Sequence, residues 1–583
     1  MDTGFVWIIG LEEIRLPLKP IYEKSPMMPL SALPLRAGGF RVSRDEVLRL
    51  YEMTKRASNR PELWEGAFRL ACAITKNPLE EPVAGWITGV LAAQGADGAL
   101  AEDEARGVAI ARAAFAMYER DARRPLLEKL LRYCAHLAAN WERVMACGAI
   151  RTRPADLMAL LEALYRVTGK KSVAALCARL REQGMDWSGV LRTFAVQRPM
   201  CRVTPWRDME AGLEAEEGSE AGFYTRQYLT CHGEALADGA RSATLCGLFS
   251  GNGQELSAAK TGWEKLRRYH GAVCGGVTAD ETLAGASPSA GVDAAALGAW
   301  AEALAAQGAA GDDPWAFEAL ETLLENGLSA AVGEEGLVPF QRVNGLSANC
   351  GTKDCYHATS DEAQSCRALN RLCRGWAAAI SAAVMTRAEG AQVNLLLPGR
   401  YALPVGGQTG VISIGGGEGE YRLSWALKEA AEAALRVRIP AWAENVSLLV
   451  NDEKVDAAEP GAYATLTRVW QDGDTVTLRC GRALRVHEGH HQSCWVTLGA
   501  QVLAYPASAE DWAVALCGEP EINAAGEVVA PVRSVPDWRR KGSVPADVPV
   551  LPETTGETRK IRLTPYAHTP CRIAMFPRGR SDG

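Results

Sequence analysis

The sequence predicts an α + β multidomain protein in which a helical toroid is followed by β-sandwich structure. From Ser43 to about Met385 the apolar residues recur at helical spacing. After Thr386 they alternate or run in short blocks between turn signals, as in strands. With 583 residues, 48% of them apolar, the chain is long enough to bury the cores of two or three domains.

Twelve segments of the first part have the length and periodicity of single helices, separated by short polar or glycine-containing turns. They are Asp45–Arg56, Pro61–Thr75, Pro82–Gln94, Ala105–Glu119, Pro125–Trp141, Pro154–Thr168, Ser172–Gln183, Gly233–Phe249, Ser257–His270, Asp293–Ala306, Pro314–Ala331 and Ala363–Met385. Consecutive helical hairpins of this kind favour an α/α toroid around a central cavity. An irregular solenoid of helix pairs is the alternative.

Eight short runs of the second part predict strands of a β-sandwich. They are Val393–Leu397, Gly410–Ile414, Tyr421–Trp425, Ala434–Ile439, Val446–Val450, Ala462–Leu466, Thr475–Arg479 and Cys494–Leu498. A last strand pair is expected at Lys560–Thr564 and Arg572–Phe576. We therefore divide the chain into a proline-rich arm (1–42) that packs on the β region, a helical domain (43–390), a β-sandwich (391–520) and a closing arm with strands (521–583).

The charge pattern excludes two classes of partner. The net charge of -7 comes from 63 basic and 70 acidic residues without long blocks of one sign, which argues against nucleic acid and against a membrane surface. The apolar run Phe5 to Leu11 is short and lacks a basic start, so we expect neither a signal peptide nor a spanning helix. The sixteen cysteines lie singly, as buried thiols in a reducing compartment do, and we expect a cytoplasmic protein.

Residues 275–295 are the most irregular stretch of the helical part and the first candidate for a site. Glycines, Pro288 and two serines interrupt any helix there, and long loops in compact domains are more often functional than idle. Asp280 and Glu281 are adjacent carboxylates that suit acid–base chemistry or a solvated turn. Asp293 precedes an alanine-rich run, where it suits a helix N-cap or a second functional carboxylate.

Several segments together resemble glycoside hydrolase family 127, the β-L-arabinofuranosidase type. In the β part they are ALRVRIPAWAENVSLLVN (434–451), AYATLTRVWQDGDTVTL (462–478) and IRLTPYAHTPCRIAMFP (561–577), and in the helical part AAQGADGAL (92–100), RTRPADLMALLEALYRVTG (151–169), the helix at His232 and DETLAGASPSAGVD (280–293). The resemblance covers the chain from about residue 40 and lies in the joint order of the segments. It implies an (α/α)6 barrel of the six-hairpin glycosidase type, followed by β-sandwich modules. It also implies a retaining hydrolase of terminal furanosides in plant-type glycans or oligosaccharides.

The resemblance implies a zinc-held cysteine thiolate as nucleophile and a glutamate as acid/base. A metal lowers the pKa of a thiol, and the thiolate divides one hard displacement into two easier ones. The metal ligands of the family are a glutamate, a cysteine two residues later and the second of two adjacent cysteines. By position, the acid/base falls on Glu281, the metal glutamate on Asp293 and the first metal cysteine on Ala295. Alanine cannot bind zinc, so the sequence departs from the pattern.

The adjacent cysteines are also absent from the matching segment, residues 363–386. Alignment on Gly375-Trp376 places Arg367 and Ala368 at the pair, and the other register places Ser365 and Cys366 there. In the second register Ser365 replaces the nucleophile, although a serine without a base is far weaker than a thiolate. We therefore expect no metal cofactor; if zinc is present, its ligands are Asp293 and Cys366, or a rearranged site in the cysteine-rich patch that contains Cys355 and His357.

Three hypotheses for function follow. The first is a glycoside hydrolase with an altered site, in which Glu281 acts with Asp280 or Asp293, since paired carboxylates suffice without metal. The second is a non-catalytic relative that binds carbohydrate or a partner protein, and the third is a sugar isomerase or lyase with His232, His357 or Tyr356 as base. The candidates for sugar contact are His232, Asp293, Trp376 and Tyr356. The expected partners are a small carbohydrate and, as an option, a second copy of the chain.

Overall fold

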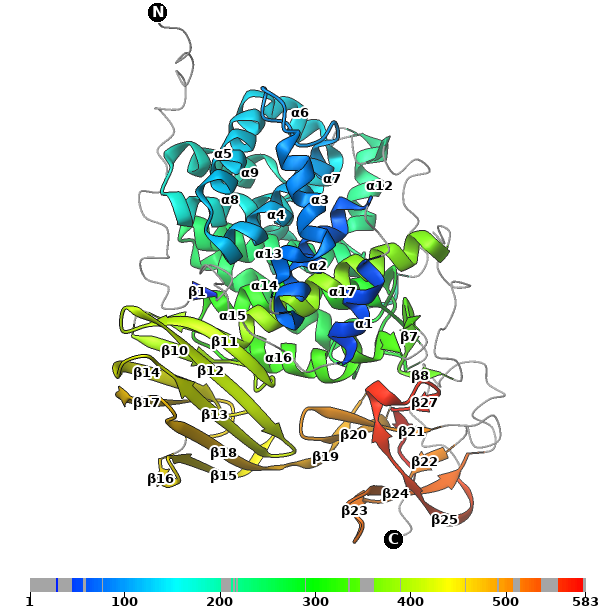
Figure 1. The fold of residues 1–583 in the computed structure, drawn as a ribbon. Coiled ribbons are helices and arrows are strands. Elements are labelled where there is room, and N and C mark those ends of the chain that lie inside the picture. The colour runs from blue at the N-terminus through cyan, green and yellow to red at the C-terminus, as the bar shows by residue number, and fades with distance from the viewer. Residues whose placement is uncertain are drawn as a thin grey trace, which may run out of the picture.

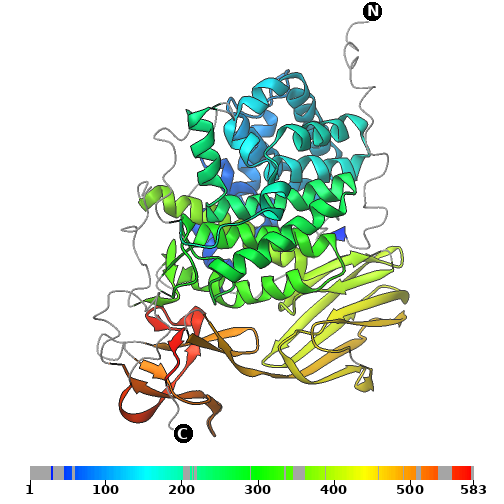
Figure 2. The same ribbon diagram turned by 180° about the vertical axis from the view of Figure 1, so that it is seen from behind.

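The computed structural model describes most of the chain. The described residues are 28–29, 45–55, 59–75, 77–200, 211–212, 215, 219–288, 290–333, 336–345, 361–387, 389–456, 458–489, 492–506, 514–535 and 554–579. A helical domain occupies the upper half of the molecule, and two β regions lie side by side beneath it (Figure 1). The view from behind shows the same division (Figure 2).

The helical domain is a barrel of packed helices. They are α1 (Asp45–Thr54), α2 (Trp64–Ile74), α3 (Pro82–Ala92), α4 (Glu104–Asp121), α5 (Arg124–Ala139), α6 (Trp141–Ala146), α7 (Gly148–Thr152), α8 (Ala155–Thr168), α9 (Lys171–Gln183), α10 (Trp187–Arg192), α12 (Glu220–Leu229), α13 (Gly233–Ser250), α14 (Gly253–His270), α15 (Ala294–Ala310), α16 (Trp315–Leu323) and α17 (Asp361–Ala383). Each of the twelve predicted segments forms a helix. The short helices α6, α7, α10 and α12 were not predicted, since so few residues carry little periodicity.

Side-chain caps and left-handed residues set many helix ends. Asp103 caps α4 by accepting a hydrogen bond from the amide of Arg106, and Asn252 caps α14 in the same way from Gln254. Gly251 ends α13 in the left-handed conformation, at φ 75°. The segment predicted as one helix from Pro314 to Ala331 changes character, because residues Leu324–Leu328 form a π-helical turn, η5.

Helices α15 and α17 touch backbone to backbone near the centre of the barrel. A Cβ on Gly298 would lie 2.2 Å from the carbonyl oxygen of Arg371, and one on Gly375 would lie 2.8 Å from the carbonyl oxygen of Gly298. Glycine is therefore required at both positions for this approach. It brings the inward-facing side chains of α17 to the barrel axis.

The first β region is a sandwich of two sheets. Its strands are β9 (Val384–Arg387), β10 (Gly390–Val393), β11 (Gly399–Val405), β12 (Gln408–Gly417), β13 (Glu420–Ala426), β14 (Ala431–Arg438), β15 (Ala443–Val450), β16 (Glu453–Val455), β17 (Tyr463–Trp470) and β18 (Thr475–Arg482). One sheet has the order β1-β9-β10-β14-β17 and the other β11-β12-β13-β18-β15-β16. Strand β1 (Met28–Pro29) of the N-terminal arm pairs with β9, so the arm joins the β region at this point.

The second β region begins at β19. Its strands are β19 (Leu484–Glu488), β20 (Ser493–Leu498), β21 (Gln501–Pro506), β22 (Val514–Leu516), β23 (Glu521–Ile522), β24 (Val528–Ser534), β25 (Thr555–Arg562), β26 (Thr564–Pro565), β27 (Arg572–Ile573) and β28 (Phe576–Pro577). Strand β8 (Asn344–Gly345), from the helical domain, completes the sheet β19-β20-β21-β27-β8. The boundary expected at residue 520 falls between β22 and β23, which belong to one sheet. Strand pairing instead divides the two β regions near residue 484.

The two closing strands were expected to pair with each other, and this expectation is wrong. Strand β25 pairs with β24, whereas β27 pairs with β21 and β8. The short helix η8 (Tyr566–His568) lies between them and carries the chain from one sheet to the other. The connection between β25 and β27 is therefore too long for a hairpin, although the two strands are close in the sequence.

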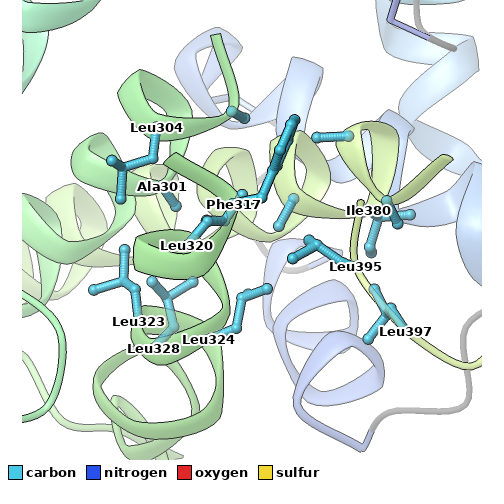
Figure 3. Close-up of a cluster of buried hydrophobic side chains, with 14 of the residues drawn as sticks. Ala301, Leu304, Phe317, Leu320, Leu323, Leu324, Leu328, Ile380, Leu395 and Leu397 are labelled. Carbon is cyan, nitrogen blue, oxygen red and sulfur yellow. The ribbon is translucent and has the colours of Figure 1, made fainter. Parts of the chain in front are cut away.

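A buried hydrophobic junction joins the barrel to the first sandwich. Phe317 and Leu320 of α16 lie in one buried cluster with Ile380 of α17 and with Leu395 and Leu397 (Figure 3). Val393–Leu397 was predicted as one strand, but β10 ends at Val393 and the leucines that follow enter this junction. The fold class predicted from the sequence is confirmed: a helical barrel followed by mainly antiparallel β-sheet domains. None of the helices in the described residues combines the length and the apolarity needed to cross a membrane.

Candidate functional site

The irregular stretch after α14 folds into a small sheet that presents Glu281 at a tight turn. Strands β2 (Ala279–Asp280) and β3 (Thr282–Leu283) pair on either side of it, and β2 also pairs with β4 (Gly291–Asp293). Glu281 adopts φ 68°, a left-handed conformation that is rare for residues other than glycine, and it is buried. Strained, buried turn residues of this kind gather at functional sites.

Helix α13 begins directly against this turn. The amide of Gly233 donates to the carbonyl oxygen of Glu281 over 2.9 Å. A Cβ on Gly233 would lie 2.7 Å from the Cβ of Ala279, so glycine allows the close approach. His232 caps α13, since its Nδ1 accepts from the amide of Ala235 at 3.3 Å. The fold thus brings His232 close to the Glu281 turn.

Asp293 is both the N-cap of α15 and one half of an ion pair. Its Oδ1 accepts from the amide of Ala295 at 2.8 Å, and its Oδ2 accepts from Nη2 of Arg367 in α17 at 2.7 Å. Asp293 is buried, and burial raises the pKa of its carboxyl against the opposing pull of Arg367. A cation is therefore already present at this carboxylate.

Arg367 lies at the centre of a cluster of ionisable groups. Burial opposes its charge, but Asp293, Glu234 and Glu281 outweigh burial and hold the pKa of Arg367 above its ordinary value. Burial, followed by the Arg367 guanidinium, lowers the pKa of His232 to about 3, so its imidazole is neutral at physiological pH. The ring of Tyr228, in α12, lies tilted by 55° against this imidazole, with 5.3 Å between the ring centroids.

A buried network of ion pairs crosses the barrel beside this cluster. Arg371 donates to Glu234 at 2.6 Å, to Asp238 at 2.5 Å and to Glu302 at 3.3 Å. Arg374 donates to Glu302 at 2.8 Å and to Asp156 at 2.9 Å. The other members are Glu65, Arg112 and Arg241, which are also largely buried.

Glu302 is the shared acceptor of this network. Burial opposes its ionisation, but Arg241, Arg374 and Arg112 hold the pKa of Glu302 below its ordinary value. Buried charges are tolerated only when they are paired in this way.

Two cavities lie on either side of the network. One has a volume of about 240 Å³ and is lined by Arg153, Glu234, Arg367 and Asn370, among others. The second has a volume of about 180 Å³. Both share Glu65, Arg112 and Arg374 in their walls, so the ion pairs separate them. The larger cavity shares Arg367 and Glu234 with the Glu281 cluster, and it is our candidate ligand pocket.

This cavity is lined by polar atoms without protein partners. The Nε of Arg367 and the Oδ1 of Asn370 are both buried and accept or donate no hydrogen bond. An unpaired buried donor and an unpaired buried acceptor cost free energy unless a ligand or water satisfies them. The hydroxyl groups of a sugar can serve either atom, because a hydroxyl both donates and accepts.

The other residues predicted for the site lie outside this cluster or outside the described part of the chain. Trp376 is fully buried in the hydrophobic core, so its ring packs the barrel and has no surface for a sugar. Tyr356, Cys355 and His357 lie outside the described residues, and the side chain of Asp280 does too. Ser365 and Cys366 lie in the first turns of α17, half-buried.

The sequence reasoning missed most of the charged residues of the barrel centre. Arg367, Arg371 and Arg374 recur at i, i+4 and i+7 on α17. The facing helix α13 has Glu234, Asp238 and Arg241 at the same spacing. Each set forms one stripe on its helix. Two complementary stripes on helices that both pack on α15 are the signal that could have indicated the network.

The zinc site implied by the family resemblance does not fit the residues present. Both oxygens of Asp293 already accept hydrogen bonds, and one of them faces the positive charge of Arg367. Ala295 offers no ligand atom. Within the part of the chain that the structure describes, no three His, Cys, Asp or Glu side chains are placed to hold a metal ion. We therefore derive no step through zinc.

Comparison with known proteins agrees with this architecture. Residues 416–481, within the first sandwich, match the family model of the GH127 middle domain of β-L-arabinofuranosidase. No curated protein matches the sequence. The structure is similar to that of a glycoside hydrolase, with a TM-score of 0.69, 16% identity, and 95% of this chain and 98% of that chain covered.

Two solved GH127 enzymes are also similar in structure. One is a β-L-arabinofuranosidase from Geobacillus stearothermophilus T6, with a TM-score of 0.62, 17% identity, and 90% and 91% of the two chains covered. The other is a GH127 β-arabinofuranosidase, with a TM-score of 0.60, 14% identity, and 95% and 98% covered. At these identities the likeness shows the fold.

The chain therefore shares its fold, a helical barrel followed by β-sandwich domains, with the solved GH127 enzymes. The match to the GH127 family model is confined to residues 416–481, in the first sandwich.

Proposed function

We propose that this protein recognises a terminal sugar of a plant-type glycan or oligosaccharide in the 240 Å³ cavity of the barrel, without zinc–thiolate chemistry. The observation that carries the proposal is the ion pair between Asp293 and Arg367. It stands where the family resemblance implies a metal carboxylate and a cysteine, and a guanidinium is neither a nucleophile nor a metal ligand.

The contact also supports one of the two sequence registers. Alignment on Gly375-Trp376 places Arg367 and Ala368 at the cysteine pair. Arg367 is the residue that contacts Asp293, as a residue at that position should. In this register the protein has neither the nucleophile nor the second thiolate ligand, which favours binding over hydrolysis.

The cavity has suitable groups for a sugar. Arg153 and Arg367 donate, Asn370 and Glu234 accept, and both arginines keep about a third of their side chains exposed, at 31% each. Alternating donors and acceptors suit the hydroxyl groups of a neutral sugar.

Hydrolysis is the second candidate, and the conformation of Glu281 favours it. This glutamate is retained at the family's acid/base position and held at φ 68° beside His232 and Arg367. A proton donor in that place, with water as nucleophile, would give slow turnover.

One experiment separates the two candidates. L-Arabinose and arabino-oligosaccharides are titrated calorimetrically into the wild type and Arg367→Met, and 4-nitrophenyl arabinofuranosides and pyranosides are tested as substrates. Binding that falls at least tenfold in Arg367→Met, without turnover, supports recognition alone. Hydrolysis is supported if the wild type shows turnover that is lost in Glu281→Gln. Glu264→Gln, which changes an exposed residue on α14, is the control and should keep that turnover. If the wild type neither binds nor hydrolyses any of these sugars, the proposal is contradicted.

A further inference from the structure

A second cavity lies outside the barrel, where three parts of the molecule meet. It has a volume of about 390 Å³ and is walled by the end of the helical domain at η5, by the first sandwich and by the second β region. This volume falls within the range of about 300–1,000 Å³ typical of small-molecule sites. We call it the junction cleft.

The walls of the junction cleft are held in place by buried hydrogen bonds. Asn326, in the π-helical turn η5, is fully buried, donates to the carbonyl oxygen of Ala500 at 2.9 Å and accepts from the amide of Val502 at 2.7 Å. These bonds fix the β20–β21 turn against the barrel. Single π-helical turns frequently mark functional sites.

On the opposite wall, Trp442 donates from its indole nitrogen to Glu321 of α16 at 3.0 Å. Glu321 in turn pairs with the buried Arg438 at 3.2 Å. The cleft is therefore built before any ligand arrives, and a bound molecule would order few additional groups.

The lining of the junction cleft combines aromatic and polar side chains. The half-buried rings of Tyr421 and Trp442 line it together with Glu321, Gln501 and Arg482. Such rings offer an apolar face and a polar edge, and the amide and carboxylate oxygens accept hydrogen bonds from hydroxyl groups.

The charges in the lining indicate which ligand fits. Of the three carboxylates that line the cleft, Glu321 is paired with Arg438. The other two, Glu325 and Glu418, outnumber the single arginine of the lining, so a phosphate, a sulfate or an acidic sugar would meet net repulsion. No metal-binding group of three such side chains occurs among the described residues, which argues against a cation. We propose that the junction cleft is a second carbohydrate site, which takes a neutral segment of a glycan outside the barrel. This inference takes from the proposed function only the idea that the ligand is a carbohydrate.

Gly417, in β12, offers a clean way to block the cleft. It lines the cavity, its φ is not left-handed, and a Cβ there would meet no atom within 4 Å. Gly417→Tyr therefore adds bulk without removing a contact. Gly415, two residues earlier on the same strand, also has open space around it but does not line the cleft, so Gly415→Tyr is the matched control.

The test is native electrophoresis of the full chain in gels that contain soluble arabinan, galactan or polygalacturonate. We expect at least one neutral polysaccharide to retard the wild type and Gly415→Tyr equally, and Gly417→Tyr at least fivefold less. Trp442→Ala should behave like Gly417→Tyr. Equal retardation of the wild type and Gly417→Tyr, the lack of any retardation, or a Gly417-dependent preference for polygalacturonate would overturn the inference.

The outcome is separable from that of the barrel site. Arg367→Met removes the proposed barrel contact and should leave gel retardation through the junction cleft intact. Conversely, Gly417→Tyr should leave calorimetric binding of L-arabinose unchanged. Retardation that persists in Arg367→Met while monosaccharide binding is absent in the wild type would refute the barrel proposal and sustain the cleft.

Discussion

Arg367 of α17 donates to Oδ2 of Asp293 across 2.7 Å, at the point where α15 begins. The contact joins two inner helices of the barrel and supplies a permanent positive charge to a carboxylate with almost no exposed surface. Because guanidinium stays protonated at every pH that proteins tolerate, this charge cannot be titrated away. Zinc, by contrast, would depend on ligands that Ala295 and Ala368 do not provide.

Replacing Arg367 should destabilise the barrel. Arg367→Met leaves the buried carboxylate of Asp293 without its partner, at a cost of about 2–3 kcal/mol. Thermal unfolding followed by circular dichroism measures this change. Arg124→Met is the control, because Arg124 and Glu128 form an exposed pair on α5 that should contribute less than about 0.5 kcal/mol. Equal effects of the two variants would contradict the pairing of Arg367 with a buried carboxylate.

Gly298 should tolerate no side chain. In Gly298→Ala the new methyl group would overlap the backbone of Arg371, and the shift would spread to the ion pairs of α17. We expect a loss of about 2 kcal/mol or more, as for other overpacked sites. Gly89→Ala on α3 has open space and should stabilise the helix by up to about 1 kcal/mol. Similar melting temperatures for the two variants would mean that α15 and α17 are not in direct contact.

Acid should weaken the network through Glu65. Burial opposes its ionisation, but Arg112, Arg69 and Arg374 outweigh burial and lower the pKa of Glu65 from 4.5 to about 2. Above pH 4.5 the stabilisation is fully present, and as pH falls toward 2 the unfolded chain takes up the proton first, so stability is lost. The contribution is about 3 kcal/mol.

Melting temperatures of the wild type and Glu65→Gln, measured between pH 5 and pH 3, test this. The difference between the two proteins should shrink as pH falls. Glu128→Gln, which changes an exposed residue, should show a constant small difference. A gap between wild type and Glu65→Gln that widens toward pH 3 would reverse the sign and contradict the account.

His232 should stay neutral across the physiological range. Burial and then Arg367 lower the pKa of this imidazole to about 3, so it takes up a proton only after the unfolded chain has done so near pH 6.5. Stability linked to His232 therefore falls as pH drops from 6.5 toward 3. In spectra of histidine-labelled protein, the resonance that disappears in His232→Gln should not shift between pH 8 and pH 4. In Arg367→Met the pKa of His232 should rise. A titration midpoint near 6.5 for His232 in the wild type would contradict the burial of this imidazole.

The sequence predicted the fold well because its signals are local. Helix α14 has an Asn252 cap and basic residues in its last turn, and β12 alternates buried and half-buried positions from Gly410 to Ile414. Periodicity over many residues and capping chemistry survive in a single sequence. Short elements such as α10, with Trp187 at its start, carry too few residues for such a signal.

The site was predicted only in part, for a physical reason. Glu281 and Asp293 stood out because glycines and proline surround them. Arg371 did not, since a charged stripe on a helix ordinarily faces solvent and only the tertiary packing of α13, α15 and α17 turns it inward. The ion pair of Arg367 with Asp293 joins residues 74 positions apart, and no local pattern indicates such a contact.

If Arg367 stands in place of a metal at Asp293, the zinc content of the purified protein shows this most directly. Elemental analysis should find no zinc bound at Asp293 in protein purified without added metal. Asp293→Ala and Cys366→Ala should leave the metal content unchanged, and chelators should leave the melting temperature unchanged. One zinc per chain that disappears in either variant would contradict the account and restore a metal–thiolate site.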